Sequence, residues 1–408
     1  MNPTSRNFAL IIVTNTLSRI ANLVLFLALP ILTLSLTGSP AWAGIVAFVN
    51  GGTAVIGSLI GGVVIDRRGA KEIAVIADIA SLVSVGMLAG IVSLGLPMWL
   101  FLIAVAAGSI LDGAGATARY TLFPHIARKT KFSMEQATSI SQTIEGISEI
   151  VGPILGGVLI GLLGGVWTLL ITAGLFGLAL IPLLVIPRVP SEYKGDTHPA
   201  EDFIEGFQVI WNDNLLRPFT LFSTAVLFFL MPFWAVLLPV YFGGEAGAVE
   251  LGTFNSVYGG FALLGAAGYG LIAGKLSKFQ TINWINWLSV PFYMIPAFVM
   301  SDSWLVWIFA GFLGLSVGPI MPIISTVYYQ RTPDKLLGRV NGTSEAMAAG
   351  AGPLGGIIFG LIIEYGSFDM AYWVFILGNF CIAIWFLLVP GLRLMDTPVM
   401  QNQSNEKV

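Results

Sequence analysis

Two carboxylates lie one helical turn apart in a stretch of the chain that is otherwise small or apolar. Glu145 and Glu149 are at positions i and i+4 of the segment 134–162, so a helix places both on one face, about 6 Å apart along its axis. Two acids this close in a low-dielectric setting suit at least one of them to reversible protonation near neutral pH. We therefore predict that the pair carries protons and can attract a cation.

Other charges also fall inside apolar segments. Arg19 and Asp112 lie well inside two of them, and Glu345 lies in a third. A charge at the bilayer centre costs at least ~2.5–3.5 kcal/mol on insertion scales, so we expect these side chains to face a wet cavity or one another. A structural ion pair between Arg19 and either Asp112 or a glutamate is the alternative to a proton-coupling role. Asp78, by contrast, is interpreted as an acid solvated at the membrane interface.

The composition indicates that a membrane surrounds these charges. The chain has 408 residues, 56% hydrophobic and 10% charged, with a mean hydropathy of +0.86, whereas soluble domains average about 25% charged residues. The single cysteine, Cys381, excludes an intrachain disulfide. Both histidines, His125 and His198, fall in polar stretches, so no metal site is expected. No phosphate-binding glycine loop is present, so we expect an ion gradient rather than ATP as the driving force. Nothing in the sequence suggests a cofactor or a nucleic-acid partner.

Twelve segments are long and apolar enough to cross a bilayer, which takes about 20 residues. They are 8–36, 41–65, 73–94, 97–122, 134–162, 166–187, 217–242, 251–273, 281–300, 304–329, 335–363 and 370–392. Lys and Arg occur in every second connection and are absent from the others. The positive-inside rule then predicts a multi-pass protein of the cytoplasmic membrane with both termini in the cytoplasm. The expected fold class is an all-α membrane protein with twelve transmembrane helices.

The longest polar stretch, 188–216, divides the chain into two halves of six spans. Residues 1–187 form the expected N-terminal half, 217–393 the C-terminal half and 394–408 a cytoplasmic tail. Apolar residues recur at helical spacing inside the stretch, which predicts an amphipathic helix at the cytoplasmic interface. These apolar residues are Phe203, Ile204, Phe207, Ile210 and Trp211.

The two halves carry one segment in common. Residues 133–153 align with 333–353 at a constant offset. The matched pairs are Thr143 with Thr343, Glu145 with Glu345, Gly152 with Gly352 and Pro153 with Pro353. Two six-span halves related by an axis along the membrane normal, with the substrate site between them near the midplane, are a known transporter plan. We therefore predict two pseudo-repeated halves.

A charged loop follows the second span. It reads Gly62-Val63-Val64-Ile65-Asp66-Arg67-Arg68-Gly69-Ala70-Lys71. The loop resembles a signature of the major facilitator superfamily, matching it at Gly62, Asp66, Arg67, Gly69 and Lys71 and departing from it at Ala70. In that family the loop latches the two halves together on the cytoplasmic side, so the resemblance implies the same latch here. A basic loop that only sets topology is the alternative.

A glycine-rich motif in the fifth span extends the resemblance. Gly152, Pro153, Gly156 and Gly157 match the antiporter motif of the superfamily. Small residues let helices pack closely, and a proline interrupts the helical hydrogen-bond ladder. In the family this motif goes with export rather than import, which favours efflux.

The fourth span departs from the family pattern. Ser109 occupies the position at which the family has an arginine, and Arg19 is the candidate to supply that charge instead. Together with the segments 35–39 and 339–342, the motifs resemble the drug:proton antiporter branch, which includes macrolide and siderophore exporters.

Aromatic side chains of spans seven and eight that lie beside polar positions are the candidates for lining a lipophilic pocket, together with nearby amides. These candidates are Asn22, Phe229, Trp234, Asn255 and Tyr258. Spans seven and ten are apolar and aromatic, which favours a lipophilic cargo. The expected function is proton-coupled efflux of amphiphilic small molecules, such as lipophilic or cationic drugs, by alternating access in a monomer. The alternatives are a proton-coupled importer of a small solute, an exporter of a siderophore or lipid, and a non-transporting receptor. No set of residues suits an enzyme.

Overall fold

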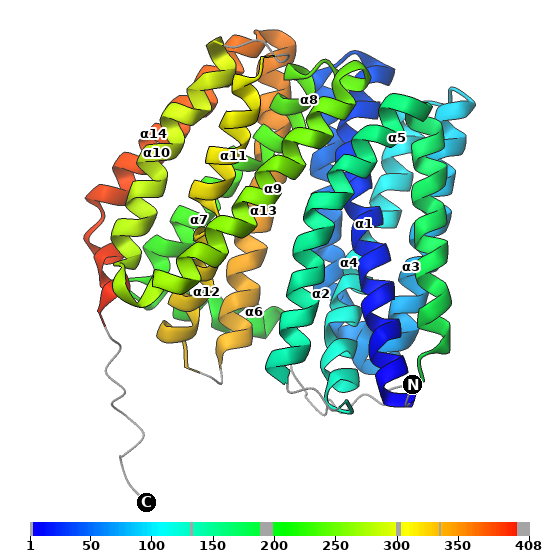
Figure 1. Cartoon of the computed structure of the whole chain (residues 1–408), viewed down its shortest axis with the longest axis horizontal. Helices are drawn as coiled ribbons and strands as arrows, with labels where there is room; N and C mark the ends of the chain where they lie inside the picture. The colour runs from blue at the N-terminus through cyan, green and yellow to red at the C-terminus, as the bar shows by residue number, and fades with distance from the viewer. Residues whose placement is uncertain (1–2, 131–133, 188–198, 299–302, 334–335, 398–408) are drawn as a thin grey trace, which may run out of the picture.

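The computed structural model describes residues 3–130, 134–187, 199–298, 303–333 and 336–397, and every regular element in those ranges is a helix (Figure 1). In hydrocarbon, each backbone N–H and C=O group must find its partner inside the protein, and a helix satisfies them within one segment. The all-helical architecture expected from the composition is therefore confirmed.

Five helices form what we call the N-terminal group. They are α1 (Pro3–Thr37), α2 (Pro40–Arg68), α3 (Ala70–Ser93), α4 (Met98–Ala127) and α5 (Met134–Val185). α5 is two successive helices that meet at Gly164, whose φ of 77° lies in the left-handed region that favours glycine. Gly69 alone makes the turn between α2 and α3, and its φ of 90° is likewise a value that favours glycine.

The remaining elements are a linker helix and what we call the C-terminal group. They are α6 (Pro199–Asn212), α7 (Leu216–Pro232), η1 (Phe233–Leu237), α8 (Leu238–Tyr241), η2 (Gly244–Gly247), α9 (Ala248–Ile272), η3 (Ala273–Lys275), α10 (Lys278–Phe298), α11 (Leu305–Val317), α12 (Ile320–Arg331), α13 (Leu337–Tyr365), α14 (Phe368–Leu388) and η5 (Pro390–Asp396). η1 is a π-helical turn that continues α7 directly into α8. α11 and α12 are separated at Gly318-Pro319.

Nine helices in the described residues are long and apolar enough to cross a membrane. α5 counts once among the nine although it turns at Gly164. α7, η1 and α8 together count once, as do α11 and α12. The helices α9 and α10, of 25 and 21 residues, are not among the nine.

The two groups stand side by side, with the helices running roughly parallel from one end of the molecule to the other (Figure 1). We call the end that carries the N-terminus and α6 the N-terminal face. The other end, which carries α8 and the turn between α13 and α14, is the opposite face (Figure 1). The largest buried cluster runs through both groups and includes Phe101, Phe176, Phe233, Phe254 and Phe309.

Two helix pairs join the groups: α2 packs along α13, and α5 packs along α9. Glycines bring the backbones together. A Cβ atom added at Gly157 would lie 2.4 Å from the carbonyl oxygen of Ala248, and one added at Gly44 would lie 2.2 Å from that of Gly356. Both contacts lie in the half of the bundle nearest the opposite face, where the two groups are therefore tightly closed.

The linker helix α6 covers the predicted amphipathic stretch and packs against the start of α13. Glu205 pairs with Arg339, and the Thr343 hydroxyl donates to the carbonyl oxygen of Phe203 at 3.2 Å. A Cβ atom at Gly206 would lie 2.5 Å from the Arg339 carbonyl oxygen. The linker is therefore fixed to the C-terminal group at the N-terminal face.

Candidate functional site

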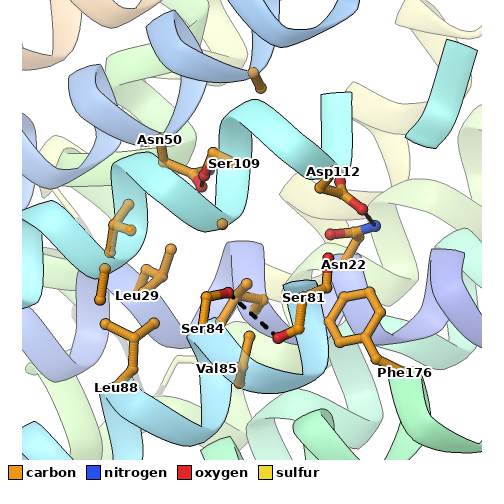
Figure 2. Close-up of a pocket in the computed structure, with 15 residues that line it drawn as sticks. Asn22, Leu29, Asn50, Ser81, Ser84, Val85, Leu88, Ser109, Asp112 and Phe176 are labelled. Atoms are coloured by element: carbon orange, nitrogen blue, oxygen red, sulfur yellow. Dashed lines mark hydrogen bonds between the residues drawn. The ribbon is translucent and has the colours of Figure 1, made fainter. Parts of the chain in front are cut away.

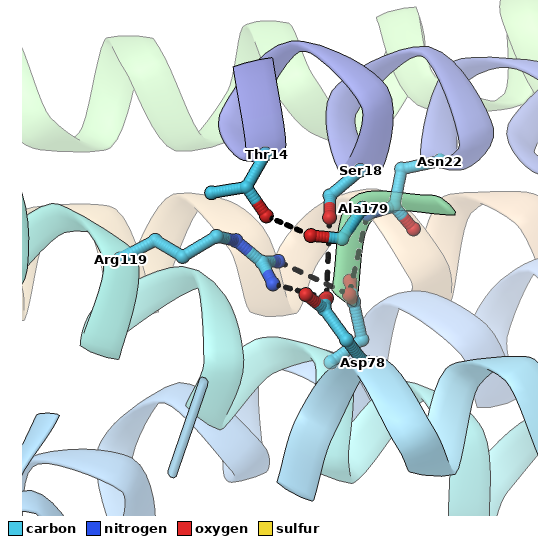
Figure 3. A network of polar contacts seen from close by, with 7 residues as sticks. Thr14, Ser18, Asn22, Asp78, Arg119 and Ala179 are labelled. Atoms are coloured by element: carbon cyan, nitrogen blue, oxygen red, sulfur yellow. Dashed lines mark hydrogen bonds and ion pairs between the residues drawn. The ribbon is translucent and has the colours of Figure 1, made fainter. Parts of the chain in front are cut away.

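The deepest charges of the N-terminal group form one network (Figure 3). Arg119 of α4 donates to Asp78 of α3 at 2.7 Å and to Asp112, two turns earlier on α4, at 3.4 Å. From α1, the Ser18 hydroxyl donates to Asp78 at 3.1 Å. Asn22, one turn further along α1, donates to Asp112 at 3.2 Å. Three helices thus meet around one guanidinium group.

Burial makes the members of this network dependent on one another. Asp78 is fully buried, and the Arg119 side chain is 9% exposed. A buried charge whose partner is removed destabilises a protein by about 3–5 kcal/mol. Arginine suits the position because its planar fork of donors stays charged and can serve two carboxylates at once. With both acids ionised, the network carries one more negative than positive charge.

The interpretation of Asp78 as an acid solvated at the membrane interface is wrong. Its position near the start of α3 suggested exposure, but α1 and α4 cover that turn of the helix and supply Ser18 and Arg119 as partners. The carboxylate is stable there because a guanidinium group lies against it. Distance from a helix end along the chain does not measure burial when neighbouring helices extend beyond that turn.

The sequence motif placed the family's arginine position at Ser109 and gave no role to Arg119, the arginine that the fourth helix does carry. Ser109 is buried and donates to Asn50 of α2 at 2.6 Å. Arg119 lies ten residues further along, near the expected end of a span, where a basic residue usually marks topology. Its seven-residue spacing from Asp112 was the available signal, because that spacing is two helical turns and puts both side chains on one face.

Arg19 does not substitute for the arginine of the fourth helix; it pairs with Glu149 of α5 at 2.5 Å. The two side chains are 44% and 42% exposed, so this ion pair faces open space inside the bundle. Glu145, one turn earlier on α5, accepts a hydrogen bond from Ser141 at 3.0 Å. The two predicted carboxylates therefore share a helix but have different partners.

A large cavity of about 620 Å³ lies beside this ion pair. Its lining residues come from α1, α4 and α5, with one residue from α12. They are Ile12, Asn15, Thr16, Arg19, Asn22, Ala116, Arg119, Tyr120, Phe123, Pro124, Thr138, Ser141, Gln142, Ile144, Glu145, Ser148 and Tyr329. The lining segments are the beginning of α1 and α5 and the end of α4 and α12, so the cavity lies toward the N-terminal face. The cavity thus presents cationic, anionic and aromatic groups together.

A second, smaller cavity of about 80 Å³ lies inside the N-terminal group (Figure 2). We call it the polar chamber. Asp112, Asn22 and Asn50 line it together with serines of α3 and α4. Leu29 and Leu88 lie at the end away from Asp112, and Phe176 of α5 lies near Asn22 and Asp112 (Figure 2). Asn22 lines both cavities.

The antiporter motif of α5 packs against two helices of different groups. Gly152 and Gly156 face Leu23 and Val24 of α1, while Gly157 faces Ala248 of α9. Pro153 lies inside α5, and its carbonyl oxygen would be 2.4 Å from a Cβ atom at Gly252 of α9. The motif therefore serves helix contact both within a group and between groups.

The repeat counterpart on α13 shows the same pattern. Gly352 faces Met231 of α7, the first long helix of the C-terminal group, and Pro353 lies against Gly51 of α2. Glu345 is exposed. The repeated segments thus occupy matching positions, each in contact with the first helix of its own group and with the other group.

The charged loop between α2 and α3 is described in part. The side chains of Asp66 and Arg67, and any contacts of Gly62, lie outside the described residues. Gly69 ends α2 by donating its N–H to the carbonyl oxygen of Ile65 at 2.7 Å. Lys71 donates to the Leu184 carbonyl oxygen near the end of α5 at 3.0 Å, where a cation is favoured by the helix dipole. This lysine contact stays within the N-terminal group.

The predicted substrate-binding residues of the C-terminal group do not gather in one place. Trp234 and Tyr258 have ring centroids 4.5 Å apart, and Trp234 belongs to the π-helical turn η1. Phe229 packs instead on Phe359 of α13, at 6.0 Å. Asn255 donates to the carbonyl oxygen of Leu251 on its own helix. None of these four predicted residues lines the large cavity.

Comparisons with known proteins identify a family and relatives. Residues 11–292 match the model of the Major Facilitator Superfamily. The multidrug efflux pump Tap of Mycolicibacterium fortuitum is 28% identical over 387 residues, covering 92% of this chain and 93% of the pump. The enterobactin exporter EntS of Shigella flexneri is 26% identical over 346 residues, covering 82% and 80% of the two chains.

Solved structures resemble this one in fold. The crystal structure of the nucleoside transporter NupG superposes with a TM-score of 0.74 at 15% identity, covering 95% of this chain and 98% of that one. A bacterial homologue of the iron transporter ferroportin, in an inward-facing state, gives a TM-score of 0.64 at 16% identity and covers 94% and 98%. At these identities the likeness concerns the fold alone.

Proposed function

Since this chain belongs to the Major Facilitator Superfamily, we propose that it is a proton-coupled antiporter that exports amphiphilic small molecules from the cytoplasm. The observation that carries the proposal is the half-exposed ion pair of Arg19 and Glu149 beside a large cavity in an otherwise apolar bundle. A charge in that setting is expensive unless it serves a charged ligand or a proton. The relatives named for multidrug efflux and enterobactin export support the direction of transport.

The proposal includes twelve membrane spans in two halves. α5 supplies two spans because it turns at Gly164, and α9 and α10 supply two more beside the remaining apolar helices. Residues 1–187 then form one half and 217–393 the other, joined by the linker 188–216 and followed by a tail, 394–408. The pairing of α2 with α13 and of α5 with α9 supports this plan.

The orientation follows from the basic loops. Lys71, Arg128 and Arg331 all lie at the N-terminal face, whereas the connections at the opposite face contain no Lys or Arg. The positive-inside rule therefore assigns the N-terminal face to the cytoplasm of a cytoplasmic-membrane protein. In that orientation the large cavity faces the cytoplasm and the groups are closed toward the outside, as an exporter awaiting its substrate requires.

The ion pair suggests how protons and substrate compete. A proton on the Glu149 carboxylate removes its charge and frees Arg19, whereas an amphiphilic cation entering the cavity is attracted by the ionised carboxylate. Binding of one therefore opposes binding of the other, which is the coupling that an antiporter needs. The cavity and both groups belong to a single chain, which supports a monomer as the working unit.

Substitution of the glutamates tests this mechanism. In everted membrane vesicles energised to an acidic interior, wild-type protein should release protons when ethidium is added. Glu149→Gln should abolish that release because an amide cannot take up a proton, and Glu145→Gln should weaken it. The exposed acid Glu250 at the opposite face provides the control variant Glu250→Gln. Release that persists unchanged in both glutamine variants would remove the proton-coupling role from this pair.

Export of an enterobactin-like molecule is the second candidate function, favoured by the 26% identity with EntS. Catecholate oxygens would meet Arg19 and Arg119 on the cavity wall. The same vesicles distinguish the two candidates, since a siderophore exporter releases protons on addition of a catecholate siderophore but not on addition of ethidium.

A further inference from the structure

The polar chamber is placed where a substrate cannot reach it. It lies between α1, α2, α3 and α4, inside the N-terminal group (Figure 2). The large cavity is lined by α1, α4, α5 and α12. With a volume of about 80 Å³, it is too small for a drug-sized molecule but has room for several waters, each of which needs roughly 10–15 Å³ of such space.

Polar groups in the chamber have hydrogen-bonding capacity that no described residue fills. Ser81 is buried, with 3% of the residue exposed. Its hydroxyl has no hydrogen-bond partner among the described residues. Ser84 donates only a long bond of 3.3 Å to the carbonyl oxygen of Ser81. Ser109 and Asn50 bond to each other at 2.6 Å and keep further capacity for donors and acceptors. Buried polar groups of this kind are usually satisfied by internal water.

Asp112 separates the chamber from the large cavity. Its carboxylate lines the chamber and accepts hydrogen bonds from Asn22 and Arg119. Both donors also line the large cavity. The groups facing Asp112 are thus Asn22 from α1 and Arg119 from α4, with Asp78 of α3 on the far side of the guanidinium. Asp112 thus lines the chamber and lies against two side chains that line the large cavity.

The electrostatics favour water over a metal cation in the chamber. Asp112 is the acid that lines it, and the Arg119 guanidinium already lies 3.4 Å from that carboxylate. A second cation beside the guanidinium would be repelled. Neutral hydroxyl and amide groups make up the remaining polar lining, and these groups bond water well.

We propose that the polar chamber holds a chain of ordered waters that carries the coupling proton between Asp112 and the opposite face, by a route separate from the substrate cavity. The proton adds to a carboxylate oxygen of Asp112 from a chamber water and leaves that oxygen, beside Asn22 and Arg119, to water in the large cavity. The wall of that cavity includes Arg19, the ion-pair partner of Glu149. No other bond changes and no electrons are exchanged. This inference rests on the proposed proton-coupled export.

The apolar end of the chamber prevents continuous leakage. Leu29, Leu88 and Val105 line the end away from Asp112. Leu88 lies five residues before the end of α3, about 7.5 Å along the helix. A short apolar barrier thus separates the chamber from the opposite face in this conformation. The chamber waters connect to that face when the groups rearrange and the barrier opens.

Filling the chamber tests the route. Ser81→Leu places a branched apolar side chain in the water space, and Gly86→Leu adds the same side chain to the same helix where a Cβ meets nothing within 4 Å. In proteoliposomes, Ser81→Leu should lower ethidium export driven by a pH gradient at least tenfold. Ethidium exchange at equal pH, which moves no net proton, should stay within twofold of wild type. Gly86→Leu should leave both activities within twofold.

A measurement on the wild-type protein tests hydration without transport. Hydroxyl radicals generated from bound water by X-rays oxidise adjacent side chains, so Phe176, fully buried against the chamber, should be labelled in wild type and at least fivefold less in Ser81→Leu. An unlabelled Phe176 in wild type, or gradient-driven export by Ser81→Leu at the wild-type rate, overturns the proposal. If wild-type export does not depend on the pH gradient while Phe176 is labelled, the chamber holds water but the proposed proton coupling is wrong, and with it the proton route.

Discussion

At the scale of single residues, the buried guanidinium of Arg119 organises three helices. It lies against two carboxylates from α3 and α4, and α1 supplies a hydroxyl and an amide to the same acids. Such a cluster specifies how α1, α3 and α4 must be oriented, because a rotation of any of them would leave a charge without its partner. The same residues form the wall between the two cavities.

Removal of the guanidinium should therefore destabilise the protein strongly. Arg119→Met keeps the length of the side chain but leaves Asp78 buried without its cation, and we expect a loss of about 3–5 kcal/mol in unfolding free energy. Unfolding of the purified protein in detergent, followed by tryptophan fluorescence, measures the change. The double variant Asp78→Leu, Arg119→Met removes both charges and should recover much of the loss; equal losses in both variants would contradict the argument.

The charges inside the membrane show what could be predicted from the sequence. Arg19, Glu149 and Asp112 were recognisable because charges are rare in apolar segments, and two of them form the expected kind of ion pair. Asp78 and Arg119 were not recognisable because both lie near expected span ends, where charges normally meet water. Their burial depends on how far neighbouring helices extend past them, which is a property of the packed bundle.

At the scale of elements, glycine-rich faces decide how closely the two groups approach. The motif of α5 was predictable as a close-packing surface, but its partner helix was not, since small residues tolerate many neighbours. The structure identifies α9 as that partner, through Gly157 and Ala248. The π-helical turn at Phe233–Leu237 also had no signal in the sequence, because it arises from one extra residue accommodated within α7 and α8.

Enlarging the glycine at this contact should separate the groups. Gly157→Val places a branched side chain where a Cβ atom would already be 2.4 Å from the Ala248 carbonyl oxygen. We expect a loss of about 1–3 kcal/mol from overpacking and at least a tenfold decrease in ethidium export. Gly174→Val, where a Cβ meets nothing within 4 Å, is the control. Normal export by Gly157→Val would show that the contact is dispensable.

At the scale of the whole molecule, the described conformation is asymmetric along the membrane normal. The groups are in close backbone contact toward the opposite face, and the large cavity lies toward the N-terminal face. The sequence predicted an all-helical membrane protein, which the structure confirms in the described residues. It could not predict which face is closed, because closure at either face of the bundle would use the same residues.

Accessibility from each side of the membrane tests the orientation. In a Cys381→Ser background, which removes the exposed native thiol, Ser141→Cys puts one thiol in the wall of the large cavity. A membrane-impermeant maleimide should label this thiol in everted vesicles at least tenfold faster than in intact cells. Faster labelling in intact cells would reverse the assigned orientation, and a cysteine at Glu250 should show the opposite preference.

The crossed pairing of the groups has a consequence for the origin of the chain. α2, the second long helix of the N-terminal group, packs against the repeated segment in α13 of the C-terminal group. In the same way α9, the second long helix of the C-terminal group, packs against the repeated segment in α5. Such reciprocal contacts are those of an isologous interface, in which one surface patch meets its own copy across a two-fold axis. A single ancestral half would thus have carried both sides of the contact and been able to dimerise before gene duplication joined two copies.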